Sequence, residues 1–237
     1  MVIMMTYAAN DIYYNIETSY GNYYKPLFAT ERDSLQLVNT PLPEPGQQES
    51  IKNMFRDLAL YPIVVQIILA RFPSLARALS HIGLVSKSTL DASVAVDASA
   101  KKYPASFSIF AKEPNVQVKS AWSVTDLLIR DLGRFAESHG SLFMLCSIPD
   151  RFQVYPKSWE KTKMQYSVTD SIWDPNLPDS LLKKITAKYD IPFLNIREHL
   201  IKHREMLYNG VHWNIRGNEI AAEIIFKELV TKGWVGK

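Results

Sequence analysis

The sequence predicts an α/β fold in which a parallel sheet is covered by helices on both faces, giving three layers. Three short runs, Val2–Tyr7, Ser141–Ile148 and Pro192–Ile196, are apolar throughout rather than alternating, which is typical of strands buried on both faces. Stretches with helical periodicity separate the later runs, and this alternation favours parallel strands. Ligands of such sheets bind at the C-terminal ends of the strands, so the residues after each strand are the first candidates for a site.

The N-terminal half begins on a strand, and we expect Ala9-Asn10-Asp11 to form a polar tight turn after it. From Tyr13 to about Gly46, aromatic residues, prolines and turn residues predict an ordered excursion with a hairpin around Asp33-Ser34. Residues 49–82 have a helical pattern that is broken by prolines, which predicts two or three short helices. We therefore expect an inserted, largely helical segment over about residues 13–120.

In the C-terminal half, Ser123 followed by Asp126 resembles a capping box and predicts a helix that ends before Gly140. We expect this helix to bury one face, made of Val124, Leu127, Leu128, Leu132 and Phe135. Two further helices are predicted, from about Asp179 to Tyr189 and from Ile215 to Thr231, the last with Asn214 as its N-cap.

Length and composition limit the classes of protein. A chain of 237 residues is best explained as a single domain. The balance of 27 Lys plus Arg against 24 Asp plus Glu, a net charge of +3, does not indicate a nucleic-acid partner. Cys146 lies in an apolar run and is interpreted as a small buried hydrophobe, so no disulfide is expected.

The sequence does not indicate a compartment or an oligomeric state. Met1–Tyr7 has no basic segment and does not resemble a secretory signal. The apolar run Leu58–Ala70 is too short to span a bilayer, so no transmembrane segment is predicted.

Two residues that flank predicted secondary-structure elements, Asn10 and His212, are candidate catalytic residues. The side-chain amide of Asn10 can donate to a developing oxyanion, although Asn-Asp after a strand is also ordinary turn chemistry. His212 lies on a short polar segment before a helix, where a general base is often found, and a surface histidine is an equally good interpretation. Trp213 is expected to anchor this segment.

Some histidines and tryptophans suggest a metal site or a sugar site. His199 and His203 are four residues apart on a predicted helix, but Leu200 stands where the His-Glu-x-x-His motif has glutamate, so surface histidines are the better interpretation. No metal and no cofactor are predicted. The aromatic residues Trp159 and Trp173, with Trp213, either line a sugar-binding cleft or serve as packing anchors.

Taken together, the pieces resemble the SGNH, or GDSL-type, hydrolase family over nearly the whole chain. Tyr7-Ala8-Ala9-Asn10-Asp11 is similar to the family's third block, Gly-x-Asn-Asp, and Asn209-Gly210-Val211-His212 is similar to its fifth, Asp-x-x-His. Further similar segments lie between and after them, namely Tyr24-Lys25-Pro26, Ala121-Trp122 to Leu127-Leu128, Ile148–Tyr155 and the run from His212 to Gly217.

The resemblance implies a flavodoxin-like sheet with Asn10 as an oxyanion donor and His212 as the general base. It also implies that the first two blocks, which carry the nucleophilic serine and an oxyanion glycine, precede Met1, so the sheet is expected to be truncated at its N-terminus. The Asp-Ser pairs within the chain lack the block's preceding glycine and are interpreted as turn or cap residues, at Asp33-Ser34, Asp170-Ser171 and Asp179-Ser180. There is no Gly-x-Ser-x-Gly elbow either.

The chain departs from the family at Asn209, which stands where the family has aspartate. An amide can orient the imidazole but cannot stabilise its charged form, and in a serine protease the equivalent change lowers turnover about 10⁴-fold. The resemblance therefore predicts an ester hydrolase or O-acyl hydrolase, inactive or impaired as this chain, acting on an acylated carbohydrate or similar small ester. The alternative is a non-catalytic module that binds an acylated or sugar ligand.

Overall fold

The computed structural model describes residues 1–20, 23–42, 103–203 and 205–236, and residues 1–40 and 101–237 belong to one compact unit. Its centre is a parallel sheet with the strand order β1-β6-β7, formed by β1 (Val2–Tyr7), β6 (Phe143–Ile148) and β7 (Phe193–Asn195). The α/β class and the parallel sheet are thus confirmed. All three predicted strands are present, with β7 shorter at both ends than the predicted Pro192–Ile196.

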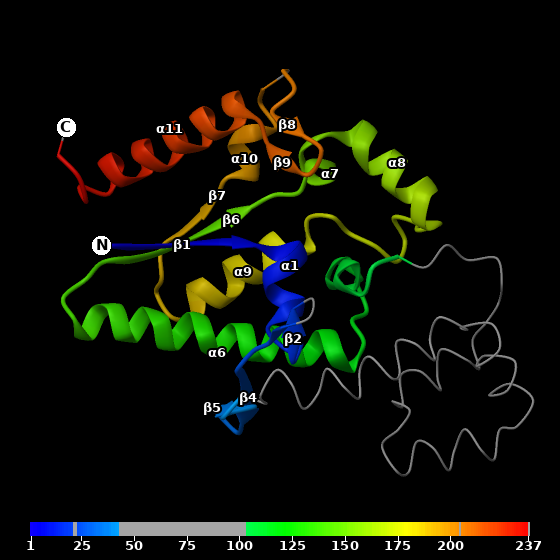
Figure 1. The fold of residues 1–237 in the computed structure, drawn as a ribbon. Helices are drawn as coiled ribbons and strands as arrows, with labels where there is room; N and C mark the ends of the chain where they lie inside the picture. The colour runs from blue at the N-terminus through cyan, green and yellow to red at the C-terminus, as the bar shows by residue number, and fades with distance from the viewer. Residues whose placement is uncertain (21–22, 43–102, 204, 237) are drawn as a thin grey trace, which may run out of the picture. The chain divides into compact units, whose positions relative to one another are not determined.

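Helices pack on both faces of this sheet (Figure 1). On one side lie α1 (Ala8–Tyr14), the 3₁₀ helix η1 (Ala105–Phe110), α6 (Val116–Ser138) and α9 (Leu177–Lys188), which share a core with Leu145 of β6. On the other side, Met144 and Cys146 pack with α10 (Arg197–Leu200) and α11 (Ile215–Thr231). Alternate residues of β6 therefore serve two separate apolar cores.

Burial differs between the strands because of their order. β6 is central, and every residue from Phe143 to Ser147 is buried. β1 is an edge strand, and of its six residues Thr6 alone is buried while Val2 is 45% exposed. The prediction that the first strand is buried on both faces is therefore wrong, since an apolar run does not reveal whether a strand lies at the centre or at the edge.

The expected tight turn after the first strand is also wrong, because β1 passes directly into α1. Ala8 and Ala9 are strong helix formers, and Ile12 is fully buried against the core from the next turn. The carboxylate of Asp11 accepts a hydrogen bond from the Tyr7 amide at 2.8 Å, which satisfies one of the free amides at the start of the helix. Asn10 consequently lies in the first turn of a helix.

The segment after α1 contains β strands. The pairs β2 (Ser19–Tyr20) with β3 (Tyr23–Tyr24), and β4 (Leu27–Glu31) with β5 (Ser34–Val38), are antiparallel. The second pair confirms the hairpin predicted around Asp33-Ser34. The helices predicted over residues 49–82 lie outside the described residues, and the described parts of the expected helical insertion consist of these hairpins, η1 and the start of α6.

Helix α6 begins eight residues earlier than predicted. Its N-cap is Asn115, whose side chain accepts from the Val118 amide at 2.9 Å, while the hydroxyl of Ser123 donates to the carbonyl of Lys119 within the helix. The predicted end is confirmed, since Gly140 follows the last turn with a positive φ of 65°.

The buried face of α6 is only partly the predicted one. Val124 and Leu127 are buried, but Leu132 and Phe135 are 43% and 64% exposed. The helix instead turns the neighbouring stripe toward the core, made of Val118, Ala121, Thr125, Ile129 and Ala136. Thr125 is the polar residue of this stripe. Its hydroxyl can be buried because it donates to the Ala121 carbonyl and accepts from the side chain of Asn15.

The C-terminal elements follow the predictions closely. α9 begins and ends within two residues of the predicted helix, and α11 has the predicted bounds with Asn214 as its N-cap. The two-stranded hairpin of β8 (Tyr208–Asn209) and β9 (His212–Trp213) precedes α11. Helix α10 ends at Leu200, so His199 and His203 do not share a helix as expected. No helix within the described ranges is long and apolar enough to cross a membrane.

Candidate functional site

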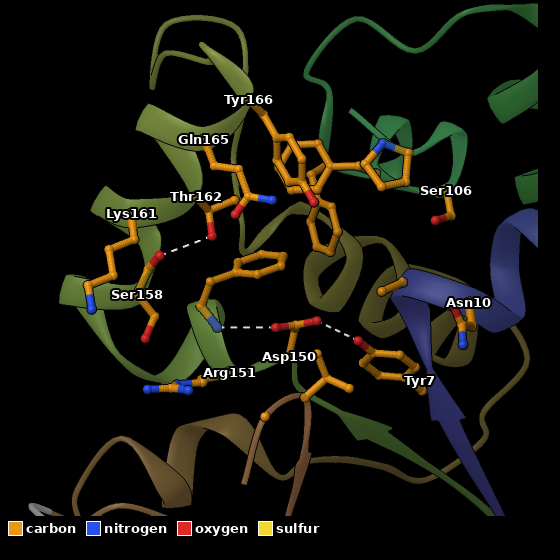
Figure 2. Close-up of a pocket in the computed structure, with 17 residues that line it drawn as sticks. Tyr7, Asn10, Ser106, Asp150, Arg151, Ser158, Lys161, Thr162, Gln165 and Tyr166 are labelled. Carbon is orange, nitrogen blue, oxygen red and sulfur yellow. Dashed lines mark hydrogen bonds between the residues drawn. The ribbon is translucent and has the colours of Figure 1, made fainter. Parts of the chain in front are cut away.

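A cavity of about 510 Å³ lies at the C-terminal edge of the parallel sheet (Figure 2). Tyr7 ends β1, Asp150 follows β6, and Gly210 and Val211 form the turn of the β8–β9 hairpin, and all of them line this cavity. Residues after two different strands and a hairpin near the end of the chain therefore converge on one space. This is where a parallel sheet is expected to hold a ligand.

Tyr7 and Asp150 form a polar floor of the cavity. The Tyr7 hydroxyl donates to Oδ2 of Asp150, while Oδ1 accepts from the Phe152 amide at 3.2 Å. The Asp150 amide in turn donates to Oε1 of Gln153 at 2.7 Å, which completes a capping box at the start of α7 (Arg151–Val154). Both carboxylate oxygens are thus engaged, and the side chain is held in one orientation.

Burial dominates the electrostatics of this pair. It raises the pKa of the Asp150 carboxyl, and the hydrogen bond from Tyr7 acts in the opposite direction. Burial also raises the pKa of Tyr7, and the neighbouring Asp150 charge adds to that effect, so the hydroxyl stays protonated and remains a donor. A carboxyl with a raised pKa in a cavity is a candidate for acid–base chemistry, but here it serves first to fix the floor.

The walls of the cavity differ in character. Helix α8 (Pro156–Tyr166) contributes polar side chains, with Lys161, Thr162 and Gln165 on one side, and Asn10 and Ser106 lie across from them (Figure 2). The hydroxyl of Thr162 donates to the Ser158 carbonyl at 3.0 Å. The cavity thus offers hydroxyl, amide and cationic groups.

Aromatic rings back the cavity. Phe107 and Phe152 line it, and Phe107 lies against the rings of Trp159 and Trp173 with centroids at 6.3 and 5.0 Å. Both tryptophans are buried behind the lining, which favours packing anchors over a tryptophan-lined sugar cleft. Trp213 packs against the second core and anchors β9, as expected.

Asn10 lies on the rim of this cavity. It is exposed in the first turn of α1, and no hydrogen bond of its side chain is recorded among the described residues. Its amide is therefore free to donate to a ligand. The oxyanion role remains a prediction.

His212 and Asn209 are brought together by the hairpin. They are direct cross-strand partners, so their side chains leave the same face of the two strands. Gly210, the first turn residue, has a φ of +64°, which suits glycine in a two-residue hairpin turn. No hydrogen bond links the two side chains, and they line a second hollow that also includes Asn214. The structure thus groups Asn209 with His212, and Asn10 with the turn between them.

Two tyrosines fix this hairpin to the segment after β6. The Tyr208 hydroxyl donates to the Pro149 carbonyl at 2.8 Å. The Tyr155 hydroxyl accepts from the Leu207 amide at 2.8 Å and donates to the Glu205 carbonyl at 2.9 Å. The hairpin that carries His212 is consequently tied to the strand end that carries Asp150.

The start of α11 locks the hairpin from the other side. The backbone amide of Asn214 donates to the Leu207 carbonyl at 2.9 Å, and the side-chain oxygen of Asn214 accepts from the Gly217 amide at 2.8 Å. Gly217 lies so close to the Leu207 carbonyl that a Cβ there would be 2.3 Å from the oxygen. This close contact explains why position 217, two residues after the start of α11 at Ile215, requires glycine.

Sequence reasoning missed several groups. The pairing of Tyr7 with Asp150 was not predicted because they are 143 residues apart and only the register of β1 with β6 brings them together. Lys161 and Gln165 were missed because an exposed helix has no signal that separates one polar position from the next. The one available signal was Asp150-Arg151 directly after an apolar strand.

The rejected Asp-Ser pairs have local roles. Ser34 donates to the Glu31 carbonyl, Ser180 donates to the Asn176 carbonyl, and Ser171 pairs with the Thr169 hydroxyl. None of these serines lines the cavity. In the described part of the chain there is also no group of three or more side chains suited to a metal ion. His199 and His203 border a separate hollow beside α11.

Comparisons with protein-family models, with curated proteins and with solved structures gave no match.

Proposed function

We propose that the chain is a member of the SGNH, or GDSL-type, ester hydrolases with a flavodoxin-like sheet, and that its cavity binds an acylated carbohydrate or a similar ester. One observation carries the proposal. Asn10, which follows the first strand, and the turn Gly210–Val211, which precedes His212, line the same cavity. The two segments that resemble the family's third and fifth blocks therefore meet at one possible ligand.

The residues present suit part of ester hydrolysis. In the proposed reaction the Asn10 amide donates to the carbonyl oxygen as it gains negative charge, an interaction typically worth about 3–4 kcal/mol in the transition state. His212 takes a proton from an attacking water as the water oxygen bonds to the ester carbon, and it returns the proton to the leaving alcohol as the ester C–O bond breaks. Asn209 lies beside His212 on the same face of the hairpin, so in the proposed reaction its amide would hydrogen-bond the imidazole, but it adds no negative charge.

Two features argue for weak catalysis by this chain. Among the described residues, no hydrogen bond joins His212 to a serine hydroxyl, and Asn209 provides no negative charge beside the imidazole. Loss of that charge alone lowers turnover on the order of 10⁴-fold in a serine protease. The chain is therefore expected to bind the ester and to hydrolyse it slowly at most.

The second candidate is a non-catalytic binding module. It is favoured by one observation, namely that Asn209 and His212 line a hollow different from the cavity that Asn10 lines. In this case the cavity holds the ligand and His212 takes no part in chemistry.

Ligand binding is tested by isothermal titration of the chain with an O-acetylated xylo-oligosaccharide. Gln165→Trp places bulk in the cavity wall and is expected to abolish binding (Figure 2). Met164→Trp is the matched control, because Met164 is the preceding residue of the same helix, is 75% exposed and does not line the cavity. Equal loss of binding in both variants, or no binding by the unaltered chain, would refute the assignment of this ligand.

Catalysis is tested with a small aryl acetate. If His212 acts as a base, Asn209→Asp raises turnover by roughly tenfold or more and a further His212→Ala change removes the gain. If the chain is a binding module, all variants hydrolyse the ester at the rate of buffer alone. Turnover like that of an efficient esterase that survives His212→Ala contradicts both candidates.

A further inference from the structure

Two cations that line the cavity have neither an ion pair nor a side-chain hydrogen bond among the described residues. Arg151 from α7 and Lys161 from α8 both line it, and the ion pairs and hydrogen bonds recorded for the described residues include neither side chain. The Nε of Arg151 is buried, and among the described residues no group accepts a hydrogen bond from it. By contrast Lys163, two residues further along α8, pairs with Glu160 at 2.9 Å and Asp170 at 2.6 Å.

The carboxylate of the cavity already accepts hydrogen bonds from the protein itself. Asp150 is the one carboxyl among the described residues that line the cavity, and its two oxygens accept from Tyr7 and from the Phe152 amide. Asp150 attracts the charge of Arg151 through space, but no carboxylate of the described residues forms an ion pair with Arg151 or Lys161. Unpaired cations of this kind raise the local concentration of anionic ligands.

Neutral donors accompany the cations on the same wall. The Ser158 hydroxyl and the Gln165 amide line the cavity, and for neither group is a donated hydrogen bond recorded within the described residues (Figure 2). Arginine presents a planar set of donors that matches a carboxylate or sulfate, and lysine adds a point charge. The wall therefore has the donor set that an oxyanion needs.

We infer that the wall formed by α7 and α8 is an oxyanion subsite, and that the ligand is an acidic carbohydrate carrying a carboxylate or sulfate beside its acyl group. The carbohydrate part of this inference rests on the proposed function. The oxyanion part rests on the two unpaired cations alone. The anionic group lies against Arg151 and Lys161, and the ester extends toward Asn10 on the opposite wall.

The inference is tested by titrating the chain with three acetylated oligosaccharides, one of galacturonate, one of sulfated xylose and one of neutral xylose. The two acidic ligands are expected to bind roughly tenfold or more tightly than the neutral one at low salt, with an advantage that shrinks as salt is added. The relative affinity of the first two identifies the anionic group. Equal affinity for all three overturns the inference.

Matched variants locate the subsite. Lys161→Gln is expected to lower the affinity for the better acidic ligand by roughly tenfold and to leave the neutral ligand unchanged. Lys157→Gln is the control, because Lys157 is an exposed lysine of the same helix that does not line the cavity. Arg151→Lys keeps the charge but removes the planar donor set, and is expected to weaken the carboxylate ligand. Equal effects of the two lysine substitutions overturn the assignment.

A titration with inorganic sulfate distinguishes failure of the oxyanion subsite from failure of the proposed carbohydrate-binding function. Sulfate binding is measured as a rise in Tm or as shifts in the NMR signals of the cavity residues. If Lys161→Gln abolishes these effects while no oligosaccharide binds to the unaltered chain, the oxyanion subsite stands and the carbohydrate function fails. If the neutral oligosaccharide binds as well as the acidic ones, the function stands and the subsite fails.

Discussion

Gly217→Ala is expected to destabilise the protein, although alanine normally favours a helix. A Cβ at this position would lie 2.3 Å from the Leu207 carbonyl oxygen and 3.1 Å from Cβ of Trp213. The carbonyl cannot simply move, because it accepts from the Asn214 amide at 2.9 Å and belongs to a fully buried residue. Relief of the contact requires the hairpin and the start of α11 to separate.

The magnitude follows from two opposing terms. Forcing an extra methyl group into a packed site costs about 1–3 kcal/mol, with the upper end expected where backbone is in the way. Alanine in place of glycine gains at most about 1 kcal/mol in a helix interior and less in a first turn. We expect a net loss of about 2 kcal/mol, which for a unit of this size lowers Tm by roughly 4–8 °C.

Gly133→Ala in the interior of α6 is the matched control. Its added Cβ would meet Cδ1 of Ile191 at 2.9 Å, and this is the far end of a flexible side chain. The variant should be as stable as the unaltered chain or more stable by up to about 1 kcal/mol. Urea unfolding followed by far-UV circular dichroism measures both, with an unchanged slope as the condition for comparison. Gly217→Ala as stable as Gly133→Ala would refute the proposed contact between α11 and Leu207.

Three further predictions concern the same region and the core. Asn214→Ala should cost about 1–2 kcal/mol and Asn214→Asp less, because aspartate keeps the acceptor for the Gly217 amide and loses only the exposed bond to the Met206 carbonyl; thermal unfolding separates them. Tyr7→Phe should cost about 1–3 kcal/mol at pH 7 and less near pH 3.5. The sign follows because the hydrogen bond from Tyr7 lowers the pKa of Asp150, which burial raises; without it the folded pKa rises further, and this costs stability as pH rises and Asp150 becomes charged but not below the unfolded pKa. Urea unfolding at both pH values measures the difference. Burial raises the pKa of Cys146 to about 12, so a disulfide reagent at pH 8 should label it only after unfolding, and rapid labelling of the native protein would contradict this.

Local signals in the sequence predicted several elements correctly. Asn214 and the periodic apolar positions after it predicted both ends of α11, because a cap and a helical stripe are encoded within a few residues. The hairpin at Asp33-Ser34 and the glycine after α6 were predicted for the same reason. The burial and the unreactive setting of Cys146 follow from the apolar run around it.

Other features depended on neighbours that are distant along the chain. The sequence pattern placed Leu132 and Phe135 in the core, but the structure turns α6 so that Thr125 and Ile129 face it. Both stripes are apolar enough to be buried, and only the packing of α1 and β6 against α6 selects between them. Asn10 was assigned to a turn because short-range patterns do not show that Ile12 has a core to pack against.

The sequence by itself determined the class of fold, the strands β1, β6 and β7, the helix α11 and the residues Asn10, Asn209 and His212 as candidates, because these depend on local periodicity, caps and short motifs. Tertiary structure alone decided which of them share a site. It placed Asn10 with the hairpin turn in one cavity and His212 with Asn209 in another hollow, and it brought Tyr7 to Asp150 and Arg151 toward Lys161. The physical reason is that strand register and helix packing set these distances, and neither is written in any short stretch of residues.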